Sequence, residues 1–546
     1  MTAKRIFFYV VLIVFVSLTL WWILYFPFSR ERLYRAIPSN ATLVSEHKNL
    51  AERWQFIARN PLTLCLLSTA GFRQSDLKKD VMDPGLVKTI KRFAGKDTVI
   101  GYIPSLNGEG DPAWVLSSWV GGSCQLMRWT SARVMAKSNL KKETLDGGRQ
   151  VWVVADANMS PSDPGVSLAV VEGVLVACLS SDRTGVRHLI NRIESGAPLH
   201  ADLRKRLSVD VSLNAEGGMV DCGWFKWHEA SGDDFRVRQF EYALTSFGEK
   251  TCAGWVRGDA DLMIPKTSGV GVTTNGASME CAARLCDSSG LEMVERALPI
   301  VPDAFAVFPF SFVEPLLSGR KASRGVRIIS RMVKAEAETN SAAFVSMFGG
   351  DLSGRLLGLK VPSLVAGVCV KNEANVMAKV PATIDTLNAL YRGGMIPRRE
   401  DISGHPVVAL DSTQSGIYGS IAATDKPAVT ARDRWFMIAS SMGTLTNALC
   451  GSGTADAKWL KGRSVVGPCS CYAWINIQSA GQAIKNAIAA YTLVLIAQNS
   501  EGTGEMRQKL GMVRTWIDVL TPLKEGELWL SFADSEFELR FKFGAE

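Results

Sequence analysis

The feature that most constrains this chain is an uninterrupted apolar run close to its amino terminus. Residues Ile6–Phe28 read IFFYVVLIVFVSLTLWWILYFPF and include no charged residue. At about 1.5 Å of rise per residue, a helix of this length exceeds the ~30 Å hydrocarbon core of a bilayer. The run is also longer than the ~7–15-residue apolar core of a cleaved signal peptide. The sequence therefore predicts a transmembrane signal anchor at residues 6–28, behind a short basic tail at residues 1–5.

The charges on the two sides of this run favour opposite orientations in the membrane. Lys4 and Arg5 precede it and favour a cytoplasmic amino terminus, whereas three arginines in the juxtamembrane linker, residues 29–35, favour the opposite. Because the leading tail is only a few residues long, we expect it to stay inside. The sequence then predicts a single-pass protein whose remaining chain is extracytoplasmic.

The rest of the chain has the composition of a folded protein. The full chain has 546 residues, of which 47% are hydrophobic and 21% charged, so several folding units with buried cores are expected. A net charge of +8 is small for this length and indicates no nucleic-acid partner. The 11 cysteines are scattered without a CxxC pair, which gives no support to a zinc ribbon or a thioredoxin-type site. Most of them are expected to be small buried side chains.

An internal repeat is indicated by segments that resemble one another in the same order. The paired segments are Ala36–Val44 with Ala297–Val307, Phe93–Asp97 with Phe348–Asp351, Leu175–Ser181 with Trp435–Ser441, and Cys222–Trp227 with Cys471–Ile477. The separations are nearly constant once loops of different length are allowed. We therefore predict two tandem copies of one module, at residues 36–296 and 297–546.

Each predicted copy mixes strands and helices without regular alternation. Strands are expected at Thr98–Ser105, Ala113–Val120, Gln125–Thr130, Gln150–Asp156, Ser167–Val171 and Val174–Leu179, with a closing hairpin around Asp534 and Ser535. A helix is expected after Ser181 or Asp182, with Val186, Leu189, Ile190 and Ile193 on one face and Gly196 at its end. Another is expected over residues 45–59. The predicted fold class is α+β: a transmembrane helix followed by two copies of an antiparallel sheet with helices.

A family resemblance rests on the opening of each copy. Pro38-Ser39-Asn40-Ala41 leads into a strand and a tryptophan-containing helix, and a similar opening returns near Pro302, behind an amino-terminal anchor. This arrangement resembles an uncharacterised bacterial envelope family that is known only as a domain of unknown function. The resemblance implies a bacterial inner-membrane protein with a periplasmic body, and it supplies no catalytic residues.

Motifs for standard chemistries are incomplete. Trp227-His228-Glu229 lacks the second histidine of a zinc protease, and no GxSxG elbow is present. His47 falls on the helix expected over residues 45–59, where it would face solvent. The sequence therefore assigns no catalytic, cofactor-binding or metal-ligating residue and no cofactor. Tryptophans such as Trp114, Trp152 and Trp224 indicate aromatic-rich sheet faces, either packed in a core or open to a lipid or glycan.

These observations favour a non-enzymatic role. The predicted function is a membrane-anchored envelope protein that binds or scaffolds a protein partner, a lipid or a cell-wall polymer. One alternative is an anchored hydrolase with an unrecognised site in one copy, which would show Asp, Glu, His or Ser side chains converging in the structure. The other alternative is a carrier of an apolar ligand, which would need a continuous apolar cavity.

Overall fold

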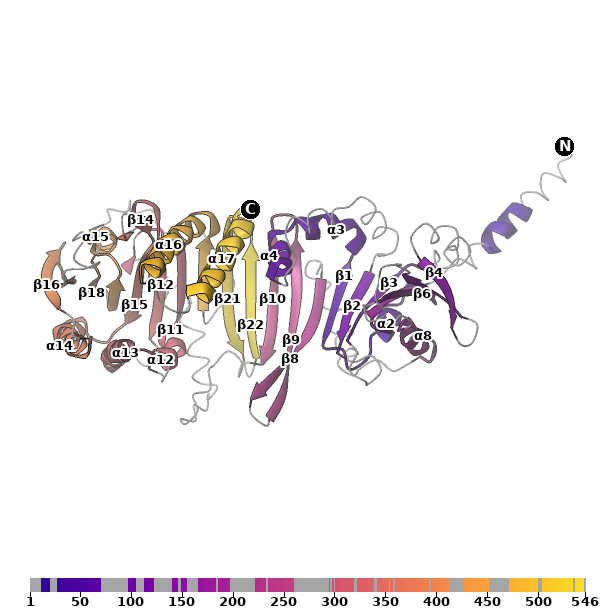
Figure 1. Cartoon of the computed structure of the whole chain (residues 1–546), viewed down its shortest axis with the longest axis horizontal. Coiled ribbons are helices and arrows are strands. Elements are labelled where there is room, and N and C mark those ends of the chain that lie inside the picture. The colour runs from indigo at the N-terminus through magenta and orange to yellow at the C-terminus, as the bar shows by residue number, and fades with distance from the viewer. Residues whose placement is uncertain are drawn as a thin grey trace. The chain divides into compact units, whose positions relative to one another are not determined.

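The computed structural model shows a fold dominated by antiparallel β-structure (Figure 1). It describes residues 11–19, 27–69, 97–104, 112–121, 140–145, 149–154, 165–182, 185–196, 221–231, 234–259, 294, 297–298, 300–318, 322–337, 341–352, 354–356, 359–391, 394–412, 426–450, 471–498, 503–533 and 536–544. Twenty of the described strands belong to one large sheet, and most helices are short. The fold class predicted from the sequence is therefore wrong.

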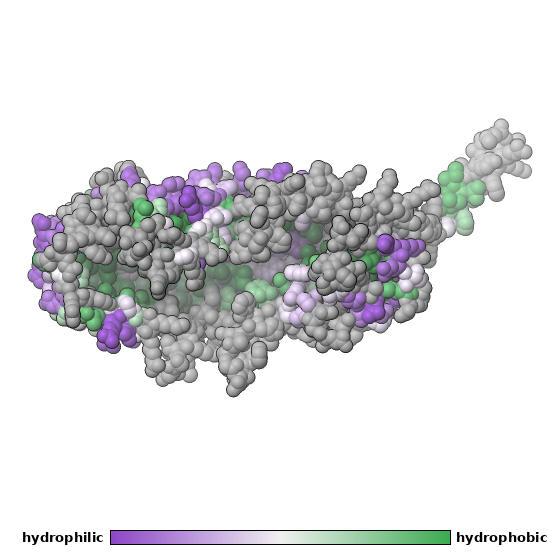
Figure 2. Space-filling model, in the orientation of Figure 1, coloured by the Kyte–Doolittle hydropathy of each residue, from purple (hydrophilic) through white to green (hydrophobic). Residues whose placement is uncertain are grey.

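The predicted transmembrane helix is part of this correction. Among the described residues, no helix is both long enough and apolar enough to cross a membrane. Within the predicted anchor, residues 11–19 form a helix whose apolar side chains are largely exposed (Figure 2), for example Ile13 at 63% and Phe15 at 67%. Residues 6–10 and 20–26 lie outside the described residues.

The chain divides into two compact units, which we call the first unit and the second unit. The first comprises Met1–Thr63 and Ala70–Glu249, and the second comprises Leu64–Thr69 and Lys250–Glu546. In the first unit the hydrogen-bonded strand order is β9 (Asp234–Phe247), β8 (Asp221–Ser231), β1 (Leu43–Lys48), β2 (Asp97–Ile103), β3 (Ala113–Trp119), β7 (Val174–Ser180), β6 (Gly165–Val171), β5 (Arg149–Val154) and β4 (Leu140–Leu145). All of these pairings are antiparallel.

The core of the first unit lies on one face of its sheet. Val44, Val99, Val115 and Val176 point into this core, which α2 (Arg30–Arg35) and α8 (Val186–Glu194) cover. The predicted helix face of α8 is confirmed, because Val186, Leu189, Ile190 and Ile193 are all buried. The strands predicted at Ser167–Val171 and Val174–Leu179 are confirmed as β6 and β7, which pair as a hairpin. Its turn residues Glu172 and Gly173 have φ of 46° and 83°, as a type I′ turn requires.

The opposite face of the first unit's sheet is only partly covered. Residues 45–59, predicted as one helix, instead form β1 and then α3 (Leu50–Arg59), separated by Asn49 in the left-handed region with φ of 50°. Leu50, Trp54 and Ile57 of α3 pack against Ile100 of β2 on this face. The chain continues into α4 (Pro61–Thr69). This half-covered face is where the candidate site lies.

The second unit has helices on both faces of its sheet. Its strand order is β10 (Cys252–Asp259), β22 (Glu536–Phe543), β21 (Glu525–Ala533), β20 (Cys471–Asn476), β11 (Ala304–Pro309), β12 (Ala342–Phe348), β15 (Ser363–Cys369), β19 (Trp435–Ala439), β18 (Ala428–Arg432), β17 (His405–Ser412) and β16 (Met395–Ile402). Its helices are α12 (Phe310–Ser318), α13 (Arg324–Glu336), α14 (Glu373–Tyr391), α15 (Met442–Cys450), α16 (Ile477–Gln498) and α17 (Thr503–Leu520), and β13 (Gly354–Leu356) pairs with β14 (Leu359–Val361).

Two hydrophobic cores enclose this second sheet. One contains Trp435, Met437 and residues of α15, and the other contains Phe436 together with residues of α13 and α14. Strands buried on both faces need nearly continuous apolar sequence, which explains the run Trp435–Ala439. The second unit's sheet therefore has hydrophobic cores on both faces, whereas the main core of the first unit lies on one face.

Candidate functional site

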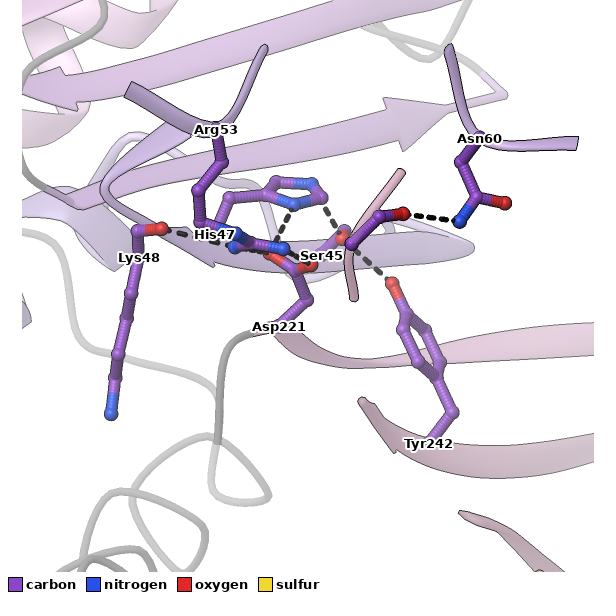
Figure 3. A network of polar contacts seen from close by, with 8 residues as sticks. Ser45, His47, Lys48, Arg53, Asn60, Asp221 and Tyr242 are labelled. Atoms are coloured by element: carbon purple, nitrogen blue, oxygen red, sulfur yellow. Dashed lines mark hydrogen bonds and ion pairs between the residues drawn. The ribbon is translucent and has the colours of Figure 1, made fainter. Parts of the chain in front are cut away.

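The candidate site is a polar network on the half-covered face of the first unit, where β1, β8, β9 and α3 contribute side chains (Figure 3). Ser45 and His47 are two residues apart on β1, so they point to the same face of the sheet. The antiparallel register places Asp221 of β8 directly opposite His47. The Asn49 turn starts α3 immediately after β1, and this brings Arg53 back over the same carboxylate.

Hydrogen bonds join these side chains in one continuous series. Tyr242 Oη donates to Ser45 Oγ at 2.6 Å, and Ser45 Oγ lies 2.8 Å from His47 Nε2. His47 Nδ1 is in turn 2.8 Å from Asp221 Oδ1. Arg53 donates from Nη1 to Asp221 Oδ1 at 3.0 Å and from Nη2 to Oδ2 at 2.6 Å. A serine, a histidine and an aspartate therefore stand in the order that nucleophilic catalysis uses.

The charges of the network are buried and paired. The side chain of Asp221 is 4% exposed, that of Arg53 14% and that of His47 20%. Burial alone raises the pKa of the Asp221 carboxyl, but the hydrogen bonds and charges of His47 and Arg53 outweigh it and hold that pKa below its usual value. Burial raises the pKa of Tyr242 to about 12, so its hydroxyl remains a proton donor at neutral pH.

Gly223 gives the Tyr242 ring its place. It lies opposite both Ser45 and Tyr242 in the strand register. A Cβ atom at Gly223 would lie 2.2 Å from the carbonyl oxygen of Val44 and 2.8 Å from Tyr242 Oη. Any larger residue would therefore push the tyrosine away from Ser45.

A row of apolar side chains crosses the same face beside the network. The members, each directly opposite the next on adjacent strands, are Phe240, Phe225, Leu43, Tyr102, Trp114 and Leu179, and we call them the aromatic row. Leu43 is two residues before Ser45 on β1, so the row and the network are neighbours. At about 4.8 Å per strand the row extends for roughly 24 Å.

The aromatic row is packed internally and open to solvent. The rings of Phe225 and Phe240 stack with centroids 4.8 Å apart, and those of Tyr102 and Trp114 are 5.0 Å apart. Trp114 is 46% exposed and Leu179 38% exposed. Trp152 and Trp224, at 5% each, are instead core residues. Of the three tryptophans singled out in the sequence, Trp114 is thus the one placed for contact with a ligand.

The polar network is not a requirement of the strand arrangement. In the second unit β20, β11 and β12 follow one another as β8, β1 and β2 do in the first. When the two units are aligned from the first residue of β1 and of β11, apolar or small residues occupy the network positions. Ala306, Phe308, Cys471 and Leu528 correspond there to Ser45, His47, Asp221 and Tyr242.

A second buried network lies on the core face of β1. Arg30 donates from Nε to Glu46 Oε1 at 2.9 Å and from Nη2 to Oε2 at 2.5 Å, and Tyr34 also donates to Glu46. Glu46 is 2% exposed. This network fixes α2 to the sheet and is closed to a ligand.

The sequence assigned no site residue, and it missed the network for an identifiable reason. His47 was expected on a helix, whereas it lies on β1 beside Ser45. His188 lies on α8, with 34% of its side chain exposed. His200 lies outside the described residues. Among the residues that the structure describes, no group of three or more His, Cys, Asp or Glu side chains could hold a metal ion.

The predicted repeat does not reveal the network either. It aligns Cys222–Trp227 with Cys471–Ile477 and so sets Asp221 against Ser470, another polar residue, whereas the strand register sets Asp221 against Cys471. A search of family models, of curated proteins and of solved structures finds no match to this chain.

Proposed function

We propose that this chain is an envelope binding protein that holds a cell-wall polymer on the aromatic row of its first unit. The observation that carries the proposal is the half-exposed Trp114 ring next to Tyr102. Aromatic rings that remain open to water on a sheet face offer stacking surfaces for the flat faces of sugar rings. The adjacent hydroxyl and imidazole groups of Ser45 and His47 add hydrogen-bonding capacity.

The shape of the row supports a polymer over an isolated acyl chain. Its members lie side by side across adjacent strands, so they form a strip of roughly 24 Å on one face. A ligand that binds a strip gains from repeated, similar units along its length. An acyl chain gains most from enclosure on several sides.

The test is a sedimentation assay with the purified full chain and insoluble cell-wall material. Wild-type protein is expected to pellet with the wall, and Trp114→Ala is expected to weaken binding about tenfold, as the loss of ~1.4 kcal/mol of stacking would. Tyr491→Ala is the matched control, because Tyr491 is 44% exposed on α16 of the second unit.

Two results would contradict the proposal. If Trp114→Ala pellets as wild type does, the aromatic row is not the binding surface. If the protein purified from membranes carries lipid and ignores the wall, the carrier alternative is favoured. The membrane partner and the periplasmic location inferred from residues 6–28 stay predictions, and fractionation of cells that express the full chain would test them.

A further inference from the structure

We infer that Ser45, His47 and Asp221 form an acyl-transfer site that hydrolyses carboxylic esters. This adds a chemical activity to the proposed binding role. The inference about the three residues stands on their geometry alone. Only the placement of the substrate on the aromatic row rests on the proposed function.

The first support is which nitrogen of His47 contacts which partner. Nε2 is 2.8 Å from the Ser45 hydroxyl, so it is placed to remove the serine proton. Nδ1 is 2.8 Å from the buried Asp221 carboxylate, which holds the ring in the tautomer with a free Nε2 lone pair. Arg53 donates hydrogen bonds to both carboxylate oxygens of Asp221 and so acts as a positioning residue for that carboxylate.

Tyr242 supplies a hydrogen-bond donor for the developing oxyanion, which an acyl-transfer site needs besides its triad. Its hydroxyl donates to Ser45 Oγ at 2.6 Å, so it lies beside the atom that would attack. When an acyl carbon bonds to Oγ, the negative charge develops on an oxygen next to that position, within reach of this donor. Ser45 is buried, at 6% exposed, whereas the His47 side chain is 20% exposed, so a substrate would have to approach the hydroxyl from the side of the imidazole.

The second support is the contrast between the two units. The corresponding positions of the second unit, Ala306, Phe308 and Cys471, cannot form this network, although β11 and β20 pair in the same way. A buried charged network costs desolvation and is often no more stabilising than well-packed apolar residues. The second unit shows that the strand arrangement exists without it, which favours a chemical role in the first.

The reaction balances without a cofactor. Ser45 Oγ attacks the ester carbonyl and forms a bond to carbon while its proton passes to His47 Nε2. The same proton then goes to the departing alcohol oxygen as the ester C–O bond breaks. Water next attacks the acyl-serine, gives its proton to His47 and releases a carboxylic acid, and Oγ recovers a proton from His47. Whichever part of the ester carries a ring, the alcohol or the acyl group, would lie on the aromatic row near Leu43.

A fluorophosphonate probe tests the inference on the full chain. Wild-type protein is expected to be labelled once, at Ser45, as located by peptide mass spectrometry. Ser45→Ala and His47→Gln should each lose more than nine-tenths of the labelling. Ser118→Ala is the matched control, since it removes a buried serine from β3 on the same face, and it should be labelled as wild type is. Circular dichroism establishes that each variant is folded.

A second measurement separates catalysis from structure. Hydrolysis of p-nitrophenyl acetate should disappear in Ser45→Ala, and Tyr242→Phe should lower kcat about 100-fold with little change in KM. Folded wild-type protein that takes no label, or Ser45→Ala that still hydrolyses the ester, would overturn the inference. The proposed function and this inference can fail separately. Ser45→Ala should still sediment with the wall if the binding role is right, and Trp114→Ala should still be labelled if the acyl-transfer role is right.

Discussion

Asp221 joins three elements of the first unit through its side chain. It belongs to β8, it accepts from His47 of β1, and it accepts from Arg53 of α3 through both oxygens. Its side chain is 4% exposed, so water compensates little for a lost partner. The carboxylate therefore fixes α3 on the half-covered face of the sheet.

Asp221→Asn is expected to lower the free energy of unfolding by about 3 kcal/mol at pH 7, because Arg53 would keep a largely buried charge without its counter-ion. The pKa of Asp221 is below its usual value in the folded protein, so its stabilisation is present above the unfolded pKa of about 3.9. That stabilisation is lost as the pH falls through the folded pKa. Urea unfolding of both proteins at pH 7 and pH 3 checks this, and a difference that does not shrink at pH 3 would refute it.

Gly223 is the second residue whose identity the structure explains. In Gly223→Ala, the new Cβ would meet the Val44 carbonyl oxygen at 2.2 Å, and backbone atoms must move to relieve this. We expect a loss of about 3 kcal/mol in the free energy of unfolding, measured in urea, together with displacement of Tyr242 from Ser45. Unchanged stability would mean that β1 and β8 can separate at this point without cost.

The sequence could not reveal Ser45 and His47 because β1 carries polar side chains on both faces. Glu46 points into the core of the first unit, where Arg30 and Tyr34 satisfy its carboxylate. Alternation of apolar and polar residues, the usual sign of a strand, is therefore absent from Ser45–Lys48. The partners that make this burial possible come from α2 and β8, which a local pattern cannot show.

Among the elements, α17 shows how a helix in the second unit tolerates poor helix formers. Gly511 lies inside α17, and a Cβ atom there would meet nothing within 4 Å. Gly511→Ala should therefore raise the free energy of unfolding by about 1 kcal/mol, because alanine loses less conformational freedom in a helix. Thermal unfolding of the full chain measures the gain. A loss of stability would contradict the open space found around this position.

Strands and hairpins with a regular local pattern were predicted well, whereas the pairing of strands far apart in the sequence was not. The expected strands at 98–105 and 113–120 correspond to β2 and β3, and the final hairpin corresponds to β21 and β22. The predicted strand at 125–130 lies outside the described residues. The pairing of β1 with β8, whose register His47↔Asp221 spans 174 positions in the chain, has no local signal.

At the scale of the whole molecule, the ionisable groups are divided unequally between the two units. Asp221 in the first unit and Glu538 in the second both have pKa values below the usual range, each through paired cations that outweigh burial. Buried thiols with raised pKa values also occur in both, Cys178 in the first and Cys369 in the second. Burial also raises the pKa values of Tyr34 and Tyr242, and both of these tyrosines belong to the first unit.

This asymmetry predicts that alkali destabilises the first unit more than the second. Burial raises the pKa of Tyr34 well above 10 and that of Tyr242 to about 12, so both stay protonated in the folded state when the unfolded chain has begun to ionise. Their contribution is complete below the unfolded pKa of about 10 and is lost as the pH rises toward the folded values. The paired carboxylates produce the opposite dependence, at acid pH and in both units.

Calorimetry of the full chain from pH 7 to pH 10.5 can test this, because units with separate cores can unfold in separate transitions. Gly223→Ala should lower only the transition of the first unit and Gly511→Ala should raise only that of the second, which assigns the two. The first-unit transition should then fall further on going to pH 10.5, and Tyr242→Phe should reduce that fall because it removes one group that ionises on unfolding. Equal falls in both transitions would show that groups other than Tyr34 and Tyr242 control alkaline stability. A fall confined to the first unit would tie its alkaline sensitivity to the buried tyrosines, one of which donates to Ser45.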